Sequence, residues 1–538
     1  MALFNSFKLP SPFVVLVGIV SYGIVKGIIW LSRPFFSPLR DLPGPPSSNF
    51  ILGNLQIYRT EETFKDRDQW LATYGKVMRI KAFLGEDRLY TTDTRALNHI
   101  LTHSMDYQKP RAVRFTLART VGDGILVTEG EQHRQQNPSF APSSIKDLTP
   151  IFFEKAIELR DLWKSQLESE KAGEKDLPQP KKIEVLSWLS RTTLDIIGLA
   201  GFHYHFDALR SGQEEDALSK AFATLLHGGG LDPFSLLQAF VPILRIIPTR
   251  RKKEEQKARN TMRQIGEQLL AERRKGGALE MGRDLLSVLV RANTDTDLPE
   301  SQRMNDEDVL AQVPTFLVAG HETTSTQTAW ALFVLAQHPE IQSRLRIELQ
   351  SISTDCPSAD DLGSERLPYL DAVVKEVMRV HSVVPLTERV AMKDDIIPVS
   401  EPYFDRKGNL RREIRIKKGE AVQIPILSLH RSRDIWGDDA SEFNPERWFK
   451  PHPASRDLPG VWSNLMTFLG GARSCIGYRF ALYEMKSLLF TLLRTFEFSL
   501  AIPADMITIR SVVVTRPFVR GEARAQMPLM VKLYAVGS

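Results

Sequence analysis

The chain of 538 residues has few cysteines, little excess charge and almost no long apolar runs. With only two cysteines, Cys356 and Cys475, at most one disulfide can form, which excludes a secreted fold held together by disulfides. The formal net charge of +5 is too slight and too evenly spread to indicate a nucleic-acid-binding protein. No Gly-x-Gly-x-x-Gly fingerprint or P-loop follows a predicted strand, so nucleotide sites of those kinds are not supported. The remaining composition is that of an ordinary globular protein.

One long apolar run stands near the amino terminus, from Phe13 to Leu31, and Lys26 is its only charge. About 20 apolar residues cross a bilayer core, and Arg33 and Arg40 after the run favour a cytoplasmic location for the rest of the chain. A cleaved signal peptide is the alternative, but the run is long for a signal core and no small-x-small cleavage site follows it. We therefore expect a short lumenal segment at 1–12, a single transmembrane anchor at 13–31, a Pro-rich hinge at 32–50 and one folded domain at 51–538.

Apolar periodicity predicts a mainly helical body with small sheets. Positions with helical spacing run through residues 151–170, 251–275, 306–337 and 341–351, and another apolar helix extends from Ile476 to Leu493. Residues 77–82 and 88–92 flank a Gly-Glu-Asp turn and predict a β-hairpin. Short strands are expected near residues 414–425 and 529–533. The chain shows no regular βαβ alternation, no internal repeat and no composition break that marks a second domain.

Cys475 stands in the stretch Phe468-Leu-Gly-Gly-Ala-Arg-Ser-Cys-Ile-Gly477, directly before a predicted helix. A helix N-terminus stabilises an anion, the glycines let backbone N–H groups approach the sulfur, and Arg473 adds a permanent positive charge. These features favour a site that holds a thiolate. A buried structural cysteine is the alternative, and it leaves the flanking glycines and the arginine unexplained.

This stretch resembles the haem-binding signature of the cytochrome P450 family, F-x-x-G-x-R-x-C-x-G, through Phe468, Gly471, Arg473, Cys475 and Gly477. Three other motifs of the family occur in the expected order: Ala319-Gly-His-Glu-Thr-Thr324, Glu376-Val-Met-Arg379 and Asn444-Pro-Glu-Arg-Trp448. The resemblance covers nearly the whole chain. It implies the mainly α cytochrome P450 fold with small β-sheets, preceded by the anchor. It also implies haem b, with Cys475 as the axial iron ligand.

The resemblance implies a haem-thiolate monooxygenase that inserts one oxygen atom from O2 into a lipophilic substrate. Electrons would come from a separate NADPH–cytochrome P450 reductase, with cytochrome b5 as a further partner. The overall style is that of a fungal microsomal member, which implies a single-pass protein of the endoplasmic reticulum membrane with its catalytic domain in the cytosol. Terpenoid or other secondary-metabolite biosynthesis is the expected setting. The alternatives are a haem-thiolate isomerase or dehydratase, and an inactive haem-binding relative.

The segment Ala319 to Thr324 resembles the oxygen-binding groove of the family. Glu322 and Thr323 would then deliver protons, which argues against an isomerase. Ala319 and Gly320 would leave room for dioxygen within the helix 306–337. A mid-helix threonine that bonds back to its own helix is the plainer interpretation of Thr323. Pro314, in the same helix, is expected to remove a backbone hydrogen bond and to bend the helix.

Glu376 and Arg379 are one helical turn apart and can pair on one face, and Arg447 could join them. By resemblance these three residues form a structural network beside the haem. Arg389 and His430 occupy positions that often contact haem propionates, although His430 could equally be a core histidine. Segments 105–117, 383–387 and 512–514 correspond to substrate-lining regions of the family, and their apolar character would also suit plain core.

The chain departs from the family pattern in the segment Gly130 to Phe140. The sequence Gly-Glu-Gln-His-Arg-Gln-Gln-Asn-Pro-Ser-Phe reaches Asn-Pro early, so that about one helical turn is missing around His133 to Asn137. The usual propionate-binding arginine is therefore lost, and Arg134 is its nearest substitute. Because this helix usually contributes to haem binding and reductase docking, the shortened segment is the basis for the inactive alternative.

Overall fold

The structure is a computed structural model. The residues that it describes are 35–47, 49–54, 62–136, 145–169, 179–210, 241–247, 249–275, 284–294, 303–511 and 514–534, together with isolated positions at 21–32 and 234–238. Residues 1–12 and most of the expected anchor at 13–31 lie outside this set. Within the described ranges, no helix combines the length and the apolar character that a membrane span requires.

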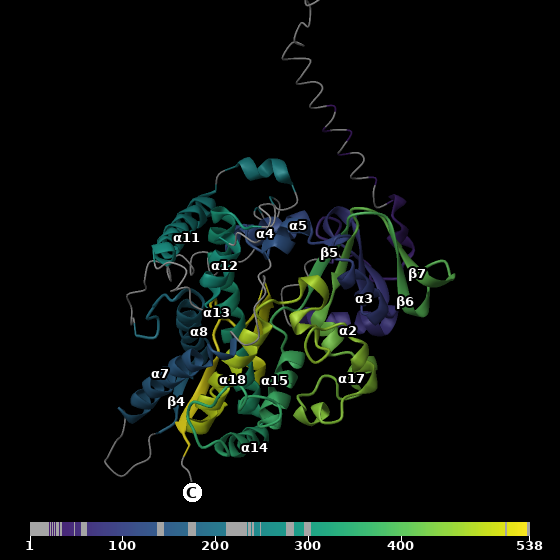
Figure 1. Cartoon of the computed structure of the whole chain (residues 1–538). Coiled ribbons are helices and arrows are strands. Elements are labelled where there is room, and N and C mark those ends of the chain that lie inside the picture. The colour runs from purple at the N-terminus through teal and green to yellow at the C-terminus, as the bar shows by residue number, and fades with distance from the viewer. Residues whose placement is uncertain are drawn as a thin grey trace, which may run out of the picture.

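Most of the long helices lie on one side of the molecule, whereas β5 of the largest sheet lies on the other side with α2, α3 and α17 (Figure 1). Helix α13 (Asp306–Gln337) runs through the middle of the helical part and packs against α8 (Val185–Phe202), α15 (Pro368–Val380) and α18 (Tyr478–Thr495). Most side chains of α13 are buried, which suits a helix that other helices surround. The prediction of a mainly helical body with small sheets is confirmed.

The expected helices at 151–170, 251–275, 306–337 and 341–351 correspond to α7, α11, α13 and α14. The remaining described α-helices and their bounds are α2 (Glu62–Tyr74), α3 (Thr94–Thr102), α4 (Arg111–Val121), α5 (Gly130–Gln136), α7 (Thr149–Glu168), α11 (Arg250–Lys275), α12 (Leu285–Thr294), α14 (Pro339–Gln350), α16 (Ile426–His430) and α17 (Arg433–Trp436).

The largest sheet has the strand order β1-β2-β8-β5-β3, with β1 (Val77–Lys81), β2 (Asp87–Thr91), β8 (Ala421–Ile424), β5 (Thr387–Ala391) and β3 (Tyr107–Gln108). Strands β1 and β2 pair antiparallel, which confirms the predicted hairpin, and β2 pairs parallel with β8. A three-stranded sheet has the order β4-β12-β9, with β4 (Lys181–Glu184), β12 (Pro528–Leu533) and β9 (Phe496–Leu500).

Two further hairpins complete the described sheets: β6 (Asp395–Phe404) with β7 (Leu410–Ile416), and β10 (Ile507–Ser511) with β11 (Thr515–Val519). The strand region expected at 414–425 is divided between β7 and β8, which belong to different sheets. A turn at Gly419, where φ is +88°, separates them. The expectation of strand structure there is confirmed, and the turn redirects the chain from one sheet to another.

Helix α13 begins with a capping box. The Asn305 side chain accepts a 2.8 Å hydrogen bond from the Asp308 N–H, and the Asp308 carboxylate accepts one of 3.3 Å from the Asn305 N–H. The helix then continues through Pro314 to Gln337 without a break, although proline has no N–H to donate. The cap and the burial of the helix on several sides therefore outweigh the disruption expected from the proline.

Gly320 has a packing role that differs from the expected one. A Cβ atom at this position would lie 2.8 Å from Cγ1 of Ile197 on α8, too close for any real side chain. The missing side chain therefore lets α8 approach α13. The space that a Cβ atom would occupy is filled by Ile197, so the expectation that this space is left for dioxygen is wrong. The glycine costs about 1 kcal/mol of helix propensity, which the closer helix packing offsets.

The described part of the expected Pro-rich hinge belongs to the folded body. Leu39 and Leu42, in and after the short helix η1 (Pro38–Asp41), are buried in the main core. The Arg79 N–H of β1 donates a 2.8 Å hydrogen bond to the Pro43 carbonyl oxygen. A Cβ atom on Gly44 would lie 2.0 Å from the Arg79 carbonyl oxygen, so only glycine allows this approach.

Candidate active site

Cys475 lies three residues before α18, at the end of a loop whose backbone holds it closely. The Cys475 N–H donates a 2.8 Å hydrogen bond to the Phe468 carbonyl oxygen, and the Gly477 N–H is directed at the sulfur and favours its anionic form. The residue is solvent-accessible, yet protein surrounds the sulfur closely enough that burial raises the pKa of the thiol to about 11. The sulfur therefore keeps its proton at neutral pH unless a metal ion replaces it.

The glycines of this loop serve two different purposes. Gly471 has φ of +69°, and a Cβ atom there would lie 2.3 Å from the Leu101 carbonyl oxygen of α3. A Cβ atom on Gly477 would instead meet no atom within 4 Å. Gly471 thus shapes the loop, whereas Gly477 leaves an open surface next to the Cys475 sulfur. Phe468 anchors the loop through an edge contact with Trp462, with ring centroids 5.7 Å apart.

A cationic cluster lies just beyond the last paired residues of β3 and β5. These strands pair Tyr107 with Ala391 and Gln108 with Val390, so the next residues, Lys109 and Arg389, face each other. The Lys109 ammonium lies 3.6 Å from the Glu129 carboxylate, which also forms an ion pair with Arg473 from the Cys475 loop. Strand pairing and the ion pairs thus bring three cations from distant parts of the sequence around one carboxylate.

The cluster carries more positive charge than the protein compensates. Burial, followed by repulsion from Arg473 and Arg389, lowers the pKa of Lys109 to about 7, although Glu129 opposes this shift. Arg389 Nη2 and Arg473 Nε and Nη1 are buried and have no hydrogen-bond partner among the described residues. Unpartnered buried donors are costly, so these N–H groups suit a ligand that brings acceptor oxygens and negative charge.

His430 lies in the core, as one of the two interpretations of the sequence predicted. It is fully buried on α16, and its Nε2 atom accepts a 2.8 Å hydrogen bond from the Met466 N–H, in the loop that leads to Cys475. Burial lowers its pKa to about 3, so the ring is neutral and Nδ1 carries the proton. This Nδ1 has no partner among the described residues, which leaves a donor that core packing does not use.

Glu322 and Thr323, in the middle of α13, have side chains that bond to different parts of the protein. The Thr323 hydroxyl donates a 2.6 Å hydrogen bond to the Ala319 carbonyl oxygen, the back-bonded geometry that sequence reasoning considered first. Ala319 is itself exposed, although most of the surrounding helix is buried. The Glu322 carboxylate is buried and forms an ion pair with Arg516 of β11. Thr323 and Glu322 thus have different partners despite being neighbours.

Arg134 lies apart from the cationic cluster. It is on α5, its side chain is 74% exposed, and its Nη2 lies 2.6 Å from Oε1 of Glu131, one turn earlier. The structure therefore brings Lys109, and not Arg134, beside Arg389 and Arg473. The remainder of the shortened segment, residues 137–144, lies outside the described residues.

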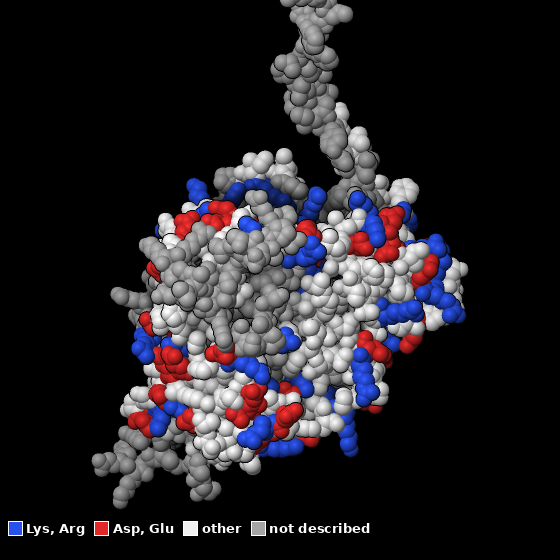
Figure 2. Space-filling model, viewed as in Figure 1, with Lys and Arg blue, Asp and Glu red and all other residues white. Residues whose placement is uncertain are grey.

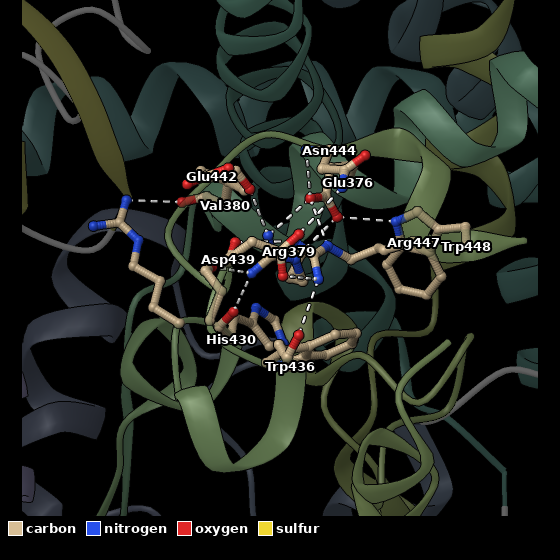
Figure 3. Close-up of polar contacts among 12 residues, drawn as sticks. Glu376, Arg379, Val380, His430, Trp436, Asp439, Glu442, Asn444, Arg447 and Trp448 are labelled. Carbon is tan, nitrogen blue, oxygen red and sulfur yellow. Dashed lines mark hydrogen bonds and ion pairs between the residues drawn. The ribbon is translucent and has the colours of Figure 1, made fainter. Parts of the chain in front are cut away.

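The predicted network of Glu376, Arg379 and Arg447 is assembled in the core (Figure 3). Arg379 donates from Nε and Nη2 to the two Glu376 oxygens, at 2.9 and 2.8 Å, and both side chains are fully buried. Arg447 donates from Nε to Glu376 Oε1 at 2.9 Å, and the Trp448 indole N–H donates to Oε2 at 3.0 Å. Every Glu376 oxygen is therefore satisfied.

The same network ties several loops together. Arg379 donates to three backbone carbonyl oxygens, and Arg447 pairs with the Asp439 carboxylate at 2.8 Å. The carbonyl oxygens that accept from Arg379 belong to His430, Ala440 and Glu442 (Figure 3). Because these contacts join α15 to the loops around α16 and α17, the network stabilises the part of the chain that supports the Cys475 loop.

Comparison with known proteins agrees with this geometry. A family model described as Cytochrome P450 matches residues 43–517, most of the chain. The chain belongs to the cytochrome P450 family. Cytochrome P450 monooxygenase 205 of Postia placenta is 48% identical over 537 residues, covering 96% of this chain and 97% of the relative. Cytochrome P450 monooxygenase 128 of the same organism is 45% identical over 523 residues, covering 93% and 94%. Ganoderic acid synthetase of Ganoderma lucidum is 33% identical over 528 residues, covering 91% and 94%.

This cytochrome P450 is therefore an oxidoreductase of a monooxygenase family that uses haem b, O2 and electrons derived from NADPH. The residues present fit haem b. Cys475 offers sulfur to the iron beside the open surface at Gly477, and the unpartnered N–H groups of Arg389, Arg473 and His430 suit the two haem carboxylates.

Sequence reasoning missed three residues of the candidate site, namely Lys109, Glu129 and Arg516. Lys109 and Glu129 form an ion pair with each other, and Arg516 reaches α13 from a hairpin near the carboxyl terminus. No local motif marks any of them. The position of Lys109 opposite Arg389 follows from the register of β3 and β5, which only the structure shows.

Proposed function

We propose that this cytochrome P450 inserts one oxygen atom from O2 into a lipophilic small molecule, with electrons supplied by NADPH–cytochrome P450 reductase. The position of the exposed residue Cys475, three residues before α18 in a chain of this family, is the observation that carries the proposal. When bound, haem supplies a redox-active iron that activates O2. Cys475 would hold that iron, while Arg389, Arg473 and Lys109 would hold the carboxylates in the cationic cluster.

Glu322 and Thr323 would control protons near the reacting oxygen. Because the Thr323 hydroxyl donates its hydrogen bond to the Ala319 carbonyl oxygen, its oxygen lone pairs remain able to accept a hydrogen bond from a group beside α13. Glu322 would relay protons, and Arg516 pairs with its buried carboxylate and holds it in position. Proton delivery thus depends on a group that α13 and β11 hold jointly.

The substrate would be a lipophilic molecule, such as a terpenoid of secondary metabolism. One apolar cluster joins α4 to α13. It includes Leu117 and Val121 of α4 and Phe316 and Val318 of α13. The Thr515 N–H, directly after the expected lining segment 512–514, donates a 2.8 Å hydrogen bond to the Val383 carbonyl oxygen of the segment 383–387. Val512 and Val513 of the third segment lie outside the described residues. An apolar lining supports a substrate with few polar groups.

The protein would be a single-pass protein of the endoplasmic reticulum membrane, anchored by residues 13–31 and with its catalytic domain in the cytosol. Supporting this, Ile243 and Ile246 on the short helix η4 (Pro242–Ile246, teal at the top of Figure 1) are exposed, as are Phe35 and Phe36. Exposed apolar side chains in such numbers are typical of contact with a membrane or a partner.

Reductase, and cytochrome b5 as a further electron donor, would dock beside the Cys475 loop. Helix α5 follows Glu129, which pairs with Arg473 of that loop, so the exposed Arg134 side chain on α5 lies on the same part of the surface. An exposed cation attracts an acidic partner and raises the rate of encounter.

The test uses the purified full-length protein loaded with haem. The reduced, carbon-monoxide-bound protein should show the red-shifted Soret band of thiolate ligation. With reductase, NADPH and 18O2, a lipophilic substrate pool should yield a product that contains one 18O atom. Turnover without incorporation of 18O would point to an isomerase or dehydratase. A folded, haem-loaded protein that oxidises no substrate would indicate an inactive relative.

The docking surface has its own test. Arg134→Glu should raise the reductase concentration needed for half-maximal NADPH oxidation several-fold, and low salt should enlarge the difference. Lys532→Glu, on β12, changes an exposed cation elsewhere and should leave that concentration unchanged. Equal effects of the two variants would contradict docking at α5.

A further inference from the structure

A groove of about 1190 Å³ lies between residues 35–41 and the β6–β7 hairpin, remote from Cys475 in the fold. Its lining is both apolar and cationic, and the side chains that matter here are Phe35, Phe36, Ile396, Arg406, Arg415 and Lys417. None of the motifs described above accounts for this groove. Its two walls come from the start of the folded chain and from a hairpin more than 350 residues later.

Direct contacts hold the two walls together. The Lys417 ammonium donates a 3.0 Å hydrogen bond to the Phe36 carbonyl oxygen, and the Arg406 N–H donates one of 2.8 Å to the Asp41 carbonyl oxygen. Lys407 pairs with the Asp41 carboxylate at 2.9 Å. With Leu39 buried in the core, the amino-terminal wall cannot move independently of the hairpin. The groove is therefore a built feature of the fold.

The hairpin is rich in positive charge. Figure 2 shows Lys and Arg side chains gathered along the right-hand edge of the molecule, where Figure 1 places β6 and β7. The acidic groups at the groove have partners of their own: Asp41 pairs with Lys407, Asp395 accepts from His99 and Tyr107, and Asp394 accepts from the Lys418 N–H. The cations of the hairpin are Arg406, Lys407, Arg411, Arg412, Arg415, Lys417 and Lys418.

Large apolar side chains are exposed next to these cations. Phe35 and Phe36 are 68% and 73% exposed, and Phe404 and Leu410, at the end of the hairpin, are exposed as well. Ile396 lies in the groove lining and is also exposed. A surface with apolar and cationic groups side by side matches an amphiphile with an anionic head and an apolar tail.

We propose that this groove binds an anionic phospholipid of the bilayer. Arg406, Arg415 and Lys417 would contact the phosphate-bearing headgroup, while Phe35 and Phe36 would lie beside the acyl chains. The inference rests on the membrane location proposed above. The apolar run ends at Leu31, four residues before Phe35, a distance of at most roughly 14 Å for an extended chain. A run that spans the bilayer therefore places the groove at the headgroups.

A lipid bound in this groove would affect how the folded domain is oriented on the membrane. Juxtamembrane cations each contribute about 1 kcal/mol of attraction to an anionic leaflet. Because the hairpin is tied to the amino-terminal wall, a lipid held between them would fix how the folded domain is oriented on the membrane. Orientation would in turn decide where the apolar face that bears η4 meets the bilayer.

Hydrogen exchange of the full-length, haem-loaded protein tests this inference. In detergent, short-chain phosphatidylserine should slow amide exchange in residues 35–41 and 395–418, whereas short-chain phosphatidylcholine and inorganic phosphate should not. The triple variant Arg406→Gln, Arg415→Gln, Lys417→Gln should weaken binding of phosphatidylserine roughly a hundredfold, about fivefold for each cation. The matched triple variant Arg366→Gln, Lys450→Gln, Lys532→Gln changes exposed cations elsewhere and should bind normally.

The same measurement in nanodiscs separates the outcomes. Slower exchange in discs that contain phosphatidylserine, compared with discs of phosphatidylcholine alone, supports the inference. Equal exchange in both kinds of disc, while the protein remains inserted, overturns the lipid site and leaves membrane location intact. If inorganic phosphate alone, or purified reductase but not lipid, slows amide exchange, the groove binds another ligand and the lipid inference is overturned. A full-length protein that inserts into neither disc overturns both proposals.

Discussion

Glu322 of α13 and Arg516 of β11 form a buried ion pair that joins the proposed proton-delivery acid to a hairpin at the other end of the chain. His321 is the other titratable neighbour, with its Nε2 3.9 Å from the Glu322 carboxylate, and burial lowers its pKa, which keeps it neutral. Arg516 is therefore the only cation paired with Glu322 among the described residues. The β10–β11 hairpin therefore supplies the counter-charge of Glu322.

Arg516→Gln should reduce the fraction of NADPH electrons that reach product. Without the guanidinium, the buried Glu322 carboxylate loses its paired counter-charge and β11 no longer holds it in position. Arg510→Gln is the matched control, because Arg510 lies directly across the hairpin from Arg516 and stacks on Phe518. Product and peroxide measured per NADPH check this, and identical yields for both variants would contradict it.

Thr323→Val should leave haem binding intact and divert NADPH electrons to hydrogen peroxide, because the lone pairs of the hydroxyl are lost. The expected change in stability is below about 1 kcal/mol, the scale of one back-bonded hydroxyl. Thr328→Val removes an equivalent bond, from the Thr328 hydroxyl to the Thr324 carbonyl oxygen, and should remain coupled. Fully coupled turnover of the Thr323 variant, measured by peroxide assay, would count against a role in proton delivery.

Cys475→Ser should abolish the thiolate Soret band in the carbon-monoxide difference spectrum, since a serine hydroxyl is not a soft anionic ligand. Cys356→Ser is the control, because Cys356 is the other free cysteine and is exposed in a loop. It should keep the spectrum unchanged. Retention of the thiolate band by the Cys475 variant would refute its assignment as the iron ligand.

Lys109→Met should remove a pH dependence of haem affinity. In the structure the pKa of Lys109 is lowered to about 7, so its ammonium loses its proton as the pH rises through that value. Anionic haem carboxylates favour the charged form, so affinity should fall above pH 7 by at most about tenfold per pH unit. Soret titration of haem-free protein at pH 6 to 9 measures this. Lys393→Met, an exposed cation paired with Asp106, should retain the dependence.

Glu376→Gln should unfold the core around α15. The substitution removes the charge that compensates Arg379 and Arg447, and breaking a buried ion pair in this way costs roughly 3 to 5 kcal/mol. Glu497→Gln, which breaks the surface pair with Lys532, should cost less than about 1 kcal/mol. Thermal unfolding and the yield of haem-loaded protein measure both, and equal stabilities would contradict a structural role for the network.

Elements with a regular local pattern were predictable from the sequence. Helix α13 begins and ends at the expected residues, because the apolar spacing and the Asn305 cap are both local signals. The pairing of Glu376 with Arg379 follows from their separation by one helical turn. In contrast, the packing role of Gly320 depends on Ile197, a residue more than 100 positions away. Its sequence context alone favoured a different role.

The candidate site shows the same division. Arg473 was predictable because it lies two residues from Cys475 in a recognisable motif, but its partner Glu129 was not. Arg134 was the nearest arginine in sequence to the expected position, yet it pairs with Glu131 at the surface. Proximity along the chain is a poor guide to charge clusters, because the ion pairs of a folded core join separate elements.

The sequence by itself determined the family and the helix that carries Glu322 and Thr323, and it predicted Cys475 as the ligand of the haem iron, since each rests on residues close together in the chain. Only the tertiary structure decided that Lys109 faces Arg389, that Arg516 holds Glu322, and that residues 35–41 form a groove with β6 and β7. The physical reason is that helical spacing is set by local backbone geometry, whereas strand register and ion pairs between elements are set by how the whole core packs.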